Sequence, residues 1–159
     1  MKLVLYTRRN VGMYCLSHLV ALGHEVSVIS DDPNVRWLAE RYGCKIYNFD
    51  TMGKDFDLFL CIHGDQILPN GILVDKKMVN IHPCLYKYKG HNPIKRYILG
   101  KDTDATVESQ FLIEEVDGGE VIHQEHFKTP ICNNFSDFYN VALVYYYKTI
   151  EATLNKLIK

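Results

Sequence analysis

The first sixty residues alternate short apolar segments with helical ones, and this alternation constrains the fold more than any other feature. Residues 11–22 and 33–43 repeat apolar side chains at helical spacing. Asp32 supplies a capping carboxylate, and Pro33 follows it at the first helical position. This order predicts parallel strands joined by helical crossovers. The strands are expected at residues 2–6, 25–29, 45–47 and 57–62.

The rest of the chain adds strands and one long helix. Ser136 is expected to cap a helix that runs to about residue 157. The N-terminal half is short, because only residues 48–56 separate the third strand from the fourth. We therefore predict one α/β domain over residues 1–159, with a mainly parallel twisted sheet and helices on both faces. The later strands are expected at residues 78–81, 105–113 and 120–128.

Composition excludes several classes of protein. A chain of 159 residues with 47% hydrophobic and 23% charged residues is typical of a globular domain. Its 18 basic and 19 acidic residues give no positive footprint for nucleic acid. The longest apolar run is too short to span a membrane and no secretory signal is visible, so we predict a cytoplasmic protein without membrane contact. Five scattered cysteines without a CxxC pair predict reduced thiols, and no metal site.

Two polar motifs carry the chemistry of the chain. Asn80 and His82 lie in Asn-Ile-His-Pro near the end of a predicted strand, and Asp117 opens an Asp-Gly-Gly loop. Ligands of open parallel sheets bind at the carboxyl ends of the strands. An amide N–H can hold a developing oxyanion, and a His/Asp couple can move protons. The three side chains are therefore predicted to converge on a site for acyl-group transfer.

Four segments, in this order, resemble the formyltransferase family. They are residues 57–69, Val79-Asn80-Ile81-His82-Pro83-Cys84-Leu85, Lys89-Gly90, and residues 115–122 around Asp117-Gly118-Gly119. The family includes glycinamide ribonucleotide, methionyl-tRNA and amino-sugar N-formyltransferases. The resemblance implies a Rossmann-like formyltransferase fold and transfer of a formyl group from 10-formyltetrahydrofolate to a primary amine, with no metal.

The resemblance also implies roles for individual residues. Asn80 would bind the oxyanion, His82 would stabilise it or deliver a proton, and Asp117 would favour the protonated imidazole. Gln110 stands where several family members carry a histidine. Folate would contact the strand-end segment His63, Gly64, Asp65, Gln66, Ile67 and Leu68, together with Val116, Gly118 and Gly119.

The first loop bears on the acceptor. Arg8, Arg9 and Asn10 follow the first strand, where two cations and helix N–H groups could meet a phosphate. They predict a phosphorylated or nucleotide-linked amine, although a solvated basic turn explains them as well.

Other functions stay open from the sequence alone. A 10-formyltetrahydrofolate hydrolase would share the same three residues, and a catalytically inactive folate- or partner-binding relative would keep the fold. A nicotinamide-binding domain is disfavoured because the first turn lacks GxGxxG. Two apolar stripes on the last helix indicate core packing first and a homodimer face second.

Overall fold

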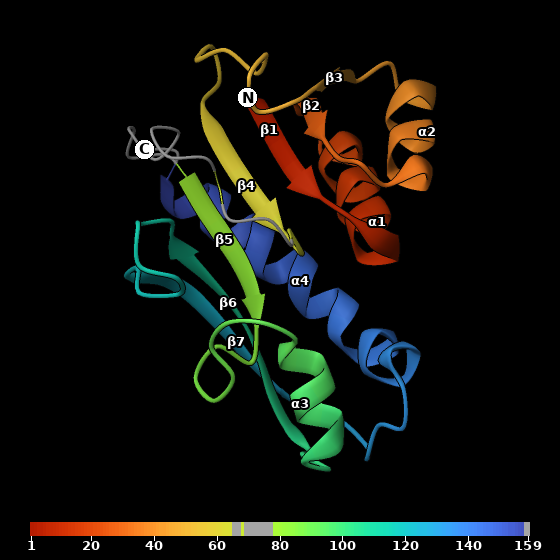
Figure 1. Cartoon of the computed structure of the whole chain (residues 1–159), viewed down its shortest axis with the longest axis vertical. Helices are drawn as coiled ribbons and strands as arrows, with labels where there is room; N and C mark the ends of the chain where they lie inside the picture. Colours follow the sequence, from red (N-terminus) through yellow and green to blue (C-terminus); the bar gives the residue numbers. More distant parts are fainter. Residues whose placement is uncertain (65–67, 69–77, 158–159) are drawn as a thin grey trace. The chain divides into compact units, whose positions relative to one another are not determined.

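A computed structural model describes residues 1–64, 68 and 78–157 of the chain (Figure 1). Its strands form one sheet in the order β3-β2-β1-β4-β5-β6-β7. The chain divides into two compact units, Met1–Asn80 and Ile81–Lys159. The elements are β1 (Lys2–Thr7), α1 (Arg9–Ala21), β2 (Glu25–Ile29), α2 (Pro33–Arg41), β3 (Lys45–Tyr47), β4 (Leu58–Ile62), β5 (Met78–Pro83), α3 (Pro93–Leu99), β6 (Asp104–Phe111), β7 (Val121–Lys128) and α4 (Phe135–Leu157).

The first unit is a parallel sheet with two crossover helices. β1 pairs in parallel with β2 and β4, and β2 pairs in parallel with β3. All five residues of β4 are buried, which explains why that segment is continuously apolar rather than alternating. Asp32 accepts hydrogen bonds from the amides of Asn34 and Val35, so the predicted cap of α2 is confirmed. The predicted α/β class is therefore confirmed.

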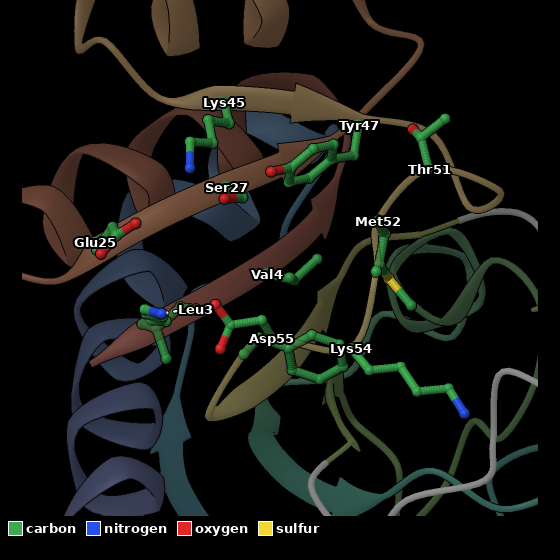
Figure 2. A pocket seen from close by; sticks show the side chains of 13 residues that line it. Leu3, Val4, Glu25, Ser27, Lys45, Tyr47, Thr51, Met52, Lys54 and Asp55 are labelled. Carbon is green, nitrogen blue, oxygen red and sulfur yellow. Dashed lines mark hydrogen bonds and ion pairs between the residues drawn. The ribbon is translucent and has the colours of Figure 1, made fainter.

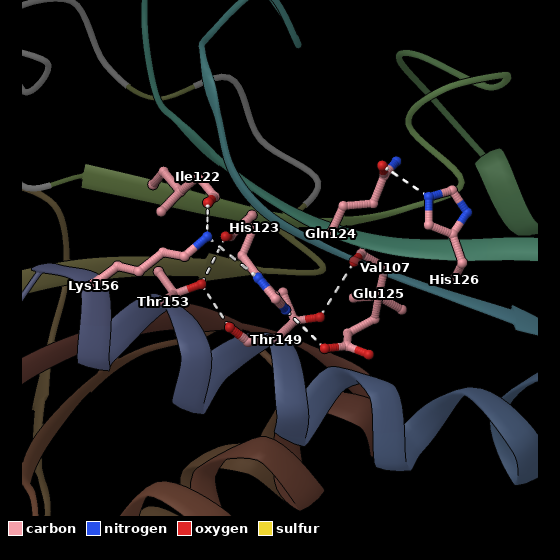
Figure 3. Close-up of polar contacts among 10 residues, drawn as sticks. Val107, Ile122, His123, Gln124, Glu125, His126, Thr149, Thr153 and Lys156 are labelled. Carbon is pink, nitrogen blue, oxygen red and sulfur yellow. Dashed lines mark hydrogen bonds and ion pairs between the residues drawn. The ribbon is translucent and has the colours of Figure 1, made fainter.

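The second unit pairs β6 with β7 in antiparallel fashion and packs α4 against them. Thr149 Oγ1 donates to the Val107 carbonyl at 3.2 Å, and Thr153 Oγ1 donates to Ser109 Oγ at 2.6 Å (Figure 3). The rings of Phe127 and Tyr145 stack with centroids 4.2 Å apart. α4 is thus held by hydrogen bonds as well as by apolar contact.

Several predicted boundaries were wrong. α1 begins at Arg9, two residues early, because Arg8 at its N-cap makes no side-chain cap that sequence could signal. β5 continues to Pro83, so His82 lies within the strand rather than just beyond it. Ser136 lies inside α4, and Asn134 Oδ1 instead accepts the Asp137 amide. The helix α3 was not predicted.

The connection between β3 and β4 contains no helix, as its length predicted. Asn48 closes a turn there by accepting the amides of Asp50 and Thr51. One face of the first unit carries a groove of about 230 Å³ between this connection and the three neighbouring strands (Figure 2). Lys2, Glu25 and Lys45, the first residues of β1, β2 and β3, line it. Within the described residues, no helix is both long and apolar enough to cross a bilayer.

Candidate active site

The centre of the candidate site is a buried pair formed by His82 and Asp117. His82 Nε2 lies 3.3 Å from Asp117 Oδ2, and their side chains are 10% and 7% exposed. His82 comes from β5, whereas Asp117 comes from the loop between β6 and β7. The structure therefore brings together two of the three predicted catalytic side chains, thirty-five positions apart in the sequence.

Asp117 is the acceptor of a converging set of donors. Its Oδ2 accepts the Gly90 amide at 2.6 Å, and its Oδ1 accepts Gln110 Nε2 at 2.9 Å. Burial alone would raise the pKa of Asp117, but the hydrogen bond and charge of His82, with the Gly90 and Gln110 bonds, lower the pKa to about 2. The carboxylate is therefore held ionised and fixed in orientation at neutral pH.

The backbone around Asp117 is shaped for this role. Asp117 has φ 54°, in the left-handed region that few residues other than glycine adopt. A side chain at Gly119 would overlap the carbonyl oxygen of Phe111, so only glycine fits there. The Phe111 amide donates to the Glu120 carbonyl and closes the loop. The Asp-Gly-Gly motif is thus a tight turn that points one carboxylate inward.

Two buried polar atoms of this site have no hydrogen-bond partner in the described part of the chain. They are Nδ1 of His82 and Oε1 of Gln110. Buried polar atoms in native proteins are nearly always paired. One belongs to the His82 ring and the other to the residue that donates to Asp117, so both exceptions lie at the His82–Asp117 pair.

Asn80 lies on β5 two residues before His82 and is half-buried. Side chains two apart on a strand point to the same face. The strand therefore presents the predicted oxyanion donor and the predicted proton carrier on one face. Convergence of Asn80 with Asp117 stays a prediction.

The predicted folate segment is described only in part. His63 has φ 62° directly after β4, and Gly64 has no room for a side chain because it lies against the Tyr6 ring. Leu68 is half-buried. Val116, on the Asp117 loop, is 63% exposed. Asp65, Gln66 and Ile67 lie outside the described residues, so the folate contacts stay a prediction.

The predicted acceptor loop makes an ion pair and a backbone hydrogen bond with two aspartates that follow β2. Arg8 Nε lies 2.7 Å from Asp31 Oδ1, and the Arg9 amide donates to Asp32 Oδ2 at 2.9 Å. Arg9 and Asn10 belong to the first turn of α1, not to a loop before it, which corrects their predicted placement. Carboxylates at the end of β2 therefore engage the groups expected to bind a phosphate.

The groove of Figure 2 contains none of the predicted site residues. In the described residues, no group of three or more His, Cys, Asp or Glu side chains is arranged to hold a metal ion.

Sequence reasoning included Gly90 in the Lys89-Gly90 segment but gave it no role at the site. The Gly90 amide donates to Asp117, and a backbone donor has no side chain to reveal it. The only signal was the glycine itself, which has φ 78°.

The α/β fold thus carries a buried imidazole–carboxylate pair, with the imidazole on a strand and the carboxylate on a loop, and a carboxylate in this position can orient an imidazole for proton transfer. Comparison with known proteins gives the family. The family model described as "Formyl transferase" matches residues 54–140, more than half of the chain. The chain belongs to the formyl transferase family.

The curated relatives agree with this assignment. Methionyl-tRNA formyltransferase of Borrelia recurrentis is 32% identical over 82 residues, which cover 51% of this chain and 26% of the relative. The enzyme of the same name from Coprothermobacter proteolyticus is 28% identical over 149 residues, covering 79% of this chain and 49% of the relative. The chain thus spans at most about half the length of these relatives.

Solved structures share the fold at lower identity. Glycinamide ribonucleotide transformylase 1 from Geobacillus kaustophilus matches with a TM-score of 0.81 at 16% identity, covering 99% of this chain and 98% of that one. A sugar 3N-formyl transferase crystallised with dTDP and 5-N-formyl-THF gives 0.80 at 21% identity, covering 99% and 63%. A formyltetrahydrofolate deformylase from Pseudomonas syringae gives 0.79 at 18%, covering 96% and 59%.

The lowered pKa of Asp117 predicts an acid-sensitive fold. A group whose pKa is depressed by folding stabilises the protein above its ordinary value, 3.8, and this contribution is lost as pH falls through the folded pKa of about 2. The loss is expected to be about 2 kcal/mol between roughly pH 5 and pH 2. Urea unfolding at several pH values measures it. The Asp117→Asn variant should show a shallower pH dependence of the unfolding free energy, by about that amount. An unchanged slope in this variant would contradict the prediction.

Proposed function

We propose that this chain transfers a formyl group from 10-formyltetrahydrofolate to the primary amine of a small phosphorylated or nucleotide-linked acceptor. The observation that carries the proposal is the buried His82–Asp117 pair, in which His82 Nδ1 has no partner within the described residues. Family membership supplies the donor class. The sugar 3N-formyl transferase crystallised with dTDP and 5-N-formyl-THF supports the kind of acceptor.

The proposed reaction balances without any further reactant. The amine nitrogen attacks the formyl carbon and forms the new C–N bond, while charge collects on the formyl oxygen. The carbonyl group re-forms from the charged oxygen as the bond between the formyl carbon and the folate nitrogen breaks. The amine loses one proton and the folate nitrogen gains one. Asn80 would donate to the oxyanion, a kind of contact worth about 10²–10³ in rate.

His82, oriented by Asp117, would carry the proton that leaves the amine and is gained by the folate nitrogen. A positioned acid or base contributes about 10²–10⁴ in rate. Asp117 Oδ2 lies 3.3 Å from Nε2 and would orient the His82 ring. Nδ1, which is buried and has no partner in the described residues, would then be the nitrogen that exchanges a proton with the reacting groups. Gln110 holds the other carboxylate oxygen and cannot ionise, so this support does not change with pH.

A bound ligand would also supply hydrogen-bond partners to His82 Nδ1 and Gln110 Oε1, the two buried atoms of this site without partners in the described residues. The residues proposed to contact the pterin are His63 and Gly64, directly after β4, and Val116, Gly118 and Gly119, on the loop of Asp117.

The proposal is tested by incubating the protein with 10-formyltetrahydrofolate and a panel of amines, then measuring tetrahydrofolate release and formylated product. The panel holds phosphorylated amines, nucleotide-linked amino sugars and their unphosphorylated counterparts. Release only in the presence of an amine supports transfer. Release with water alone identifies a hydrolase, and binding without release identifies an inactive folate-binding relative.

The Arg8–Asp31 pair gives a prediction about the acceptor. Asp31 would compete with a phosphate for the Arg8 guanidinium, and a partly exposed ion pair of this kind is worth at most about 1 kcal/mol. Asp31→Asn should therefore lower KM for a phosphorylated acceptor about two- to fivefold. Arg8→Ala should raise KM by about tenfold, the worth of one charge-assisted hydrogen bond. Steady-state kinetics with the phosphorylated and unphosphorylated forms of one amine measures both.

The control is Asp50→Asn, which removes a carboxylate from the turn between β3 and β4. It should leave KM unchanged. If Arg8→Ala changes KM equally for both forms of the amine, Arg8 does not bind the phosphate.

A further inference from the structure

Glu108 is a buried carboxylate that the proposed reaction does not use. It lies in the middle of β6 and is 1% exposed. Its oxygens accept four hydrogen bonds, from the Leu85 amide at 3.1 Å, the Tyr86 amide at 3.4 Å, Gln124 Nε2 at 2.9 Å and Thr106 Oγ1. A carboxyl group buried this deeply costs several kcal/mol unless donors surround it. These donors satisfy the buried carboxylate, and in return the carboxylate fixes the positions of the groups that donate to it.

What Glu108 holds is the start of the segment 84–90, which we call the anchor loop. Cys84 has φ 54° and turns the chain directly after β5, and the Tyr88 amide closes the turn on the Cys84 carbonyl at 2.8 Å. In the middle of the loop, Lys87 Nζ donates a hydrogen bond of 2.7 Å to Asp102 Oδ1. The loop is therefore fixed at its first residues by the buried side chain of Glu108 and at its middle by the half-buried side chain of Asp102.

The anchor loop ends at the candidate active site. Its last residue, Gly90, donates its amide to Asp117 Oδ2 at 2.6 Å, the same oxygen that faces His82. The loop thus begins two residues after His82 and finishes on the carboxylate that orients His82. A shift of the loop at its start would move Gly90 and leave Asp117 one donor short.

The neighbouring strand β7 also supplies a donor to Glu108, the side chain of Gln124. Gln124 presents its amide nitrogen to Glu108 and its carbonyl oxygen to His126 Nε2, 3.0 Å away. In Figure 3, Gln124 and His126 project from β7 away from α4, whereas His123 and Glu125 project toward that helix. The Glu108 contacts therefore belong to the face of the β6–β7 pair that α4 does not cover.

We propose that Glu108 is a positioning residue for formyl transfer: its buried carboxylate fixes the anchor loop, and the loop delivers the Gly90 amide to Asp117. The inference deepens the proposed function and rests on it for the kinetic effect. Glu108 touches no reacting group. Its carboxylate holds the amides of Leu85 and Tyr86 at the start of the anchor loop, and the end of that loop donates the Gly90 amide to Asp117.

The test compares Glu108→Ala and Glu108→Gln with the wild-type protein by amide hydrogen exchange and by kinetics. Removal of the carboxylate leaves two loop amides without an acceptor, so exchange at Leu85, Tyr86 and Gly90 should accelerate about tenfold or more. The turnover number should fall about 10- to 100-fold, with KM for the folate within about threefold. Glu108→Gln keeps one carbonyl acceptor and should recover part of both losses.

The matched control is Glu125→Gln on β7, which makes the same charge change at a side chain paired with His123 at 2.7 Å. It should leave Gly90 exchange and turnover within about twofold of the wild type. If Glu108→Ala does not fold, Gln124→Ala removes one donor to Glu108 and should give a smaller change in the same direction.

Unchanged exchange at Gly90 in the folded Glu108 variants would overturn the proposal. A loss of turnover no larger than the loss of folded protein would overturn it too. Exchange is measured without substrate, so absence of formyl transfer by the wild-type chain would count against the proposed function and leave the loop test in force.

Discussion

Replacing Asp117 with asparagine is expected to lower the turnover number of formyl transfer by about 10²–10⁴-fold while the protein stays folded. The carboxylate accepts from Gly90 and His82 on one oxygen and from Gln110 on the other. An asparagine amide would set its NH₂ against one of these donors in either orientation. The His82 ring would lose its orienting acceptor and the site would lose its fixed charge.

Initial rates of formylated product, together with thermal melting, measure this effect. Asp104→Asn is the control, because Asp104 is a 70% exposed carboxylate paired with Lys128 in the same unit. Its turnover should stay within about twofold of the wild type. Near-normal turnover in Asp117→Asn would remove the proposed proton-transfer step.

Replacing Asn80 with alanine is expected to lower the turnover number by about 10²–10³-fold, with little change in KM for the folate. The reason is the loss of an N–H donor to the oxyanion, which develops only as the amine attacks. Asn80→Asp separates donation from packing, because it keeps the shape of the side chain and removes its donor. Both variants should be slow if donation matters, whereas only alanine should be slow if packing does.

The control for Asn80 is Asn140→Ala, at an exposed position of α4. Its rate should match the wild type. A change in KM alone for Asn80→Ala would assign Asn80 to ligand binding and not to stabilisation of the oxyanion.

Sequence patterns predicted the strands of the first unit closely, because these strands carry unambiguous apolar and β-branched runs. The predicted bounds of β2 and β3 match the observed Glu25–Ile29 and Lys45–Tyr47. The helix α3 was missed because only Ile94 and Tyr97 are buried in its seven residues. Asn92-Pro93 is a start signal of the same kind as Asp32-Pro33, but Asn92 adopts a left-handed conformation and makes no cap hydrogen bond, and the helix that follows has too few apolar positions to show a stripe.

The candidate site could be predicted in part. Side chains with distinctive chemistry, His82 and Asp117, were expected to meet, and the structure places them 3.3 Å apart. Glu108 could not be identified from the pattern because residues 105–110 of β6 are all buried, so alternation between faces is lost. Thr149 and Thr153 were missed on α4 for a related reason, since hydrophobic stripes do not mark buried hydroxyl groups.

The helix-free connection between β3 and β4 leaves β3 as a three-residue strand with a single neighbour in the strand order. An edge strand of three residues presents few unpaired backbone N–H and C=O groups to another chain, and its first residue, Lys45, is charged. Short edges with lysine disfavour the addition of strands from other molecules. The shortened half of the fold therefore carries its own protection against edge-to-edge aggregation.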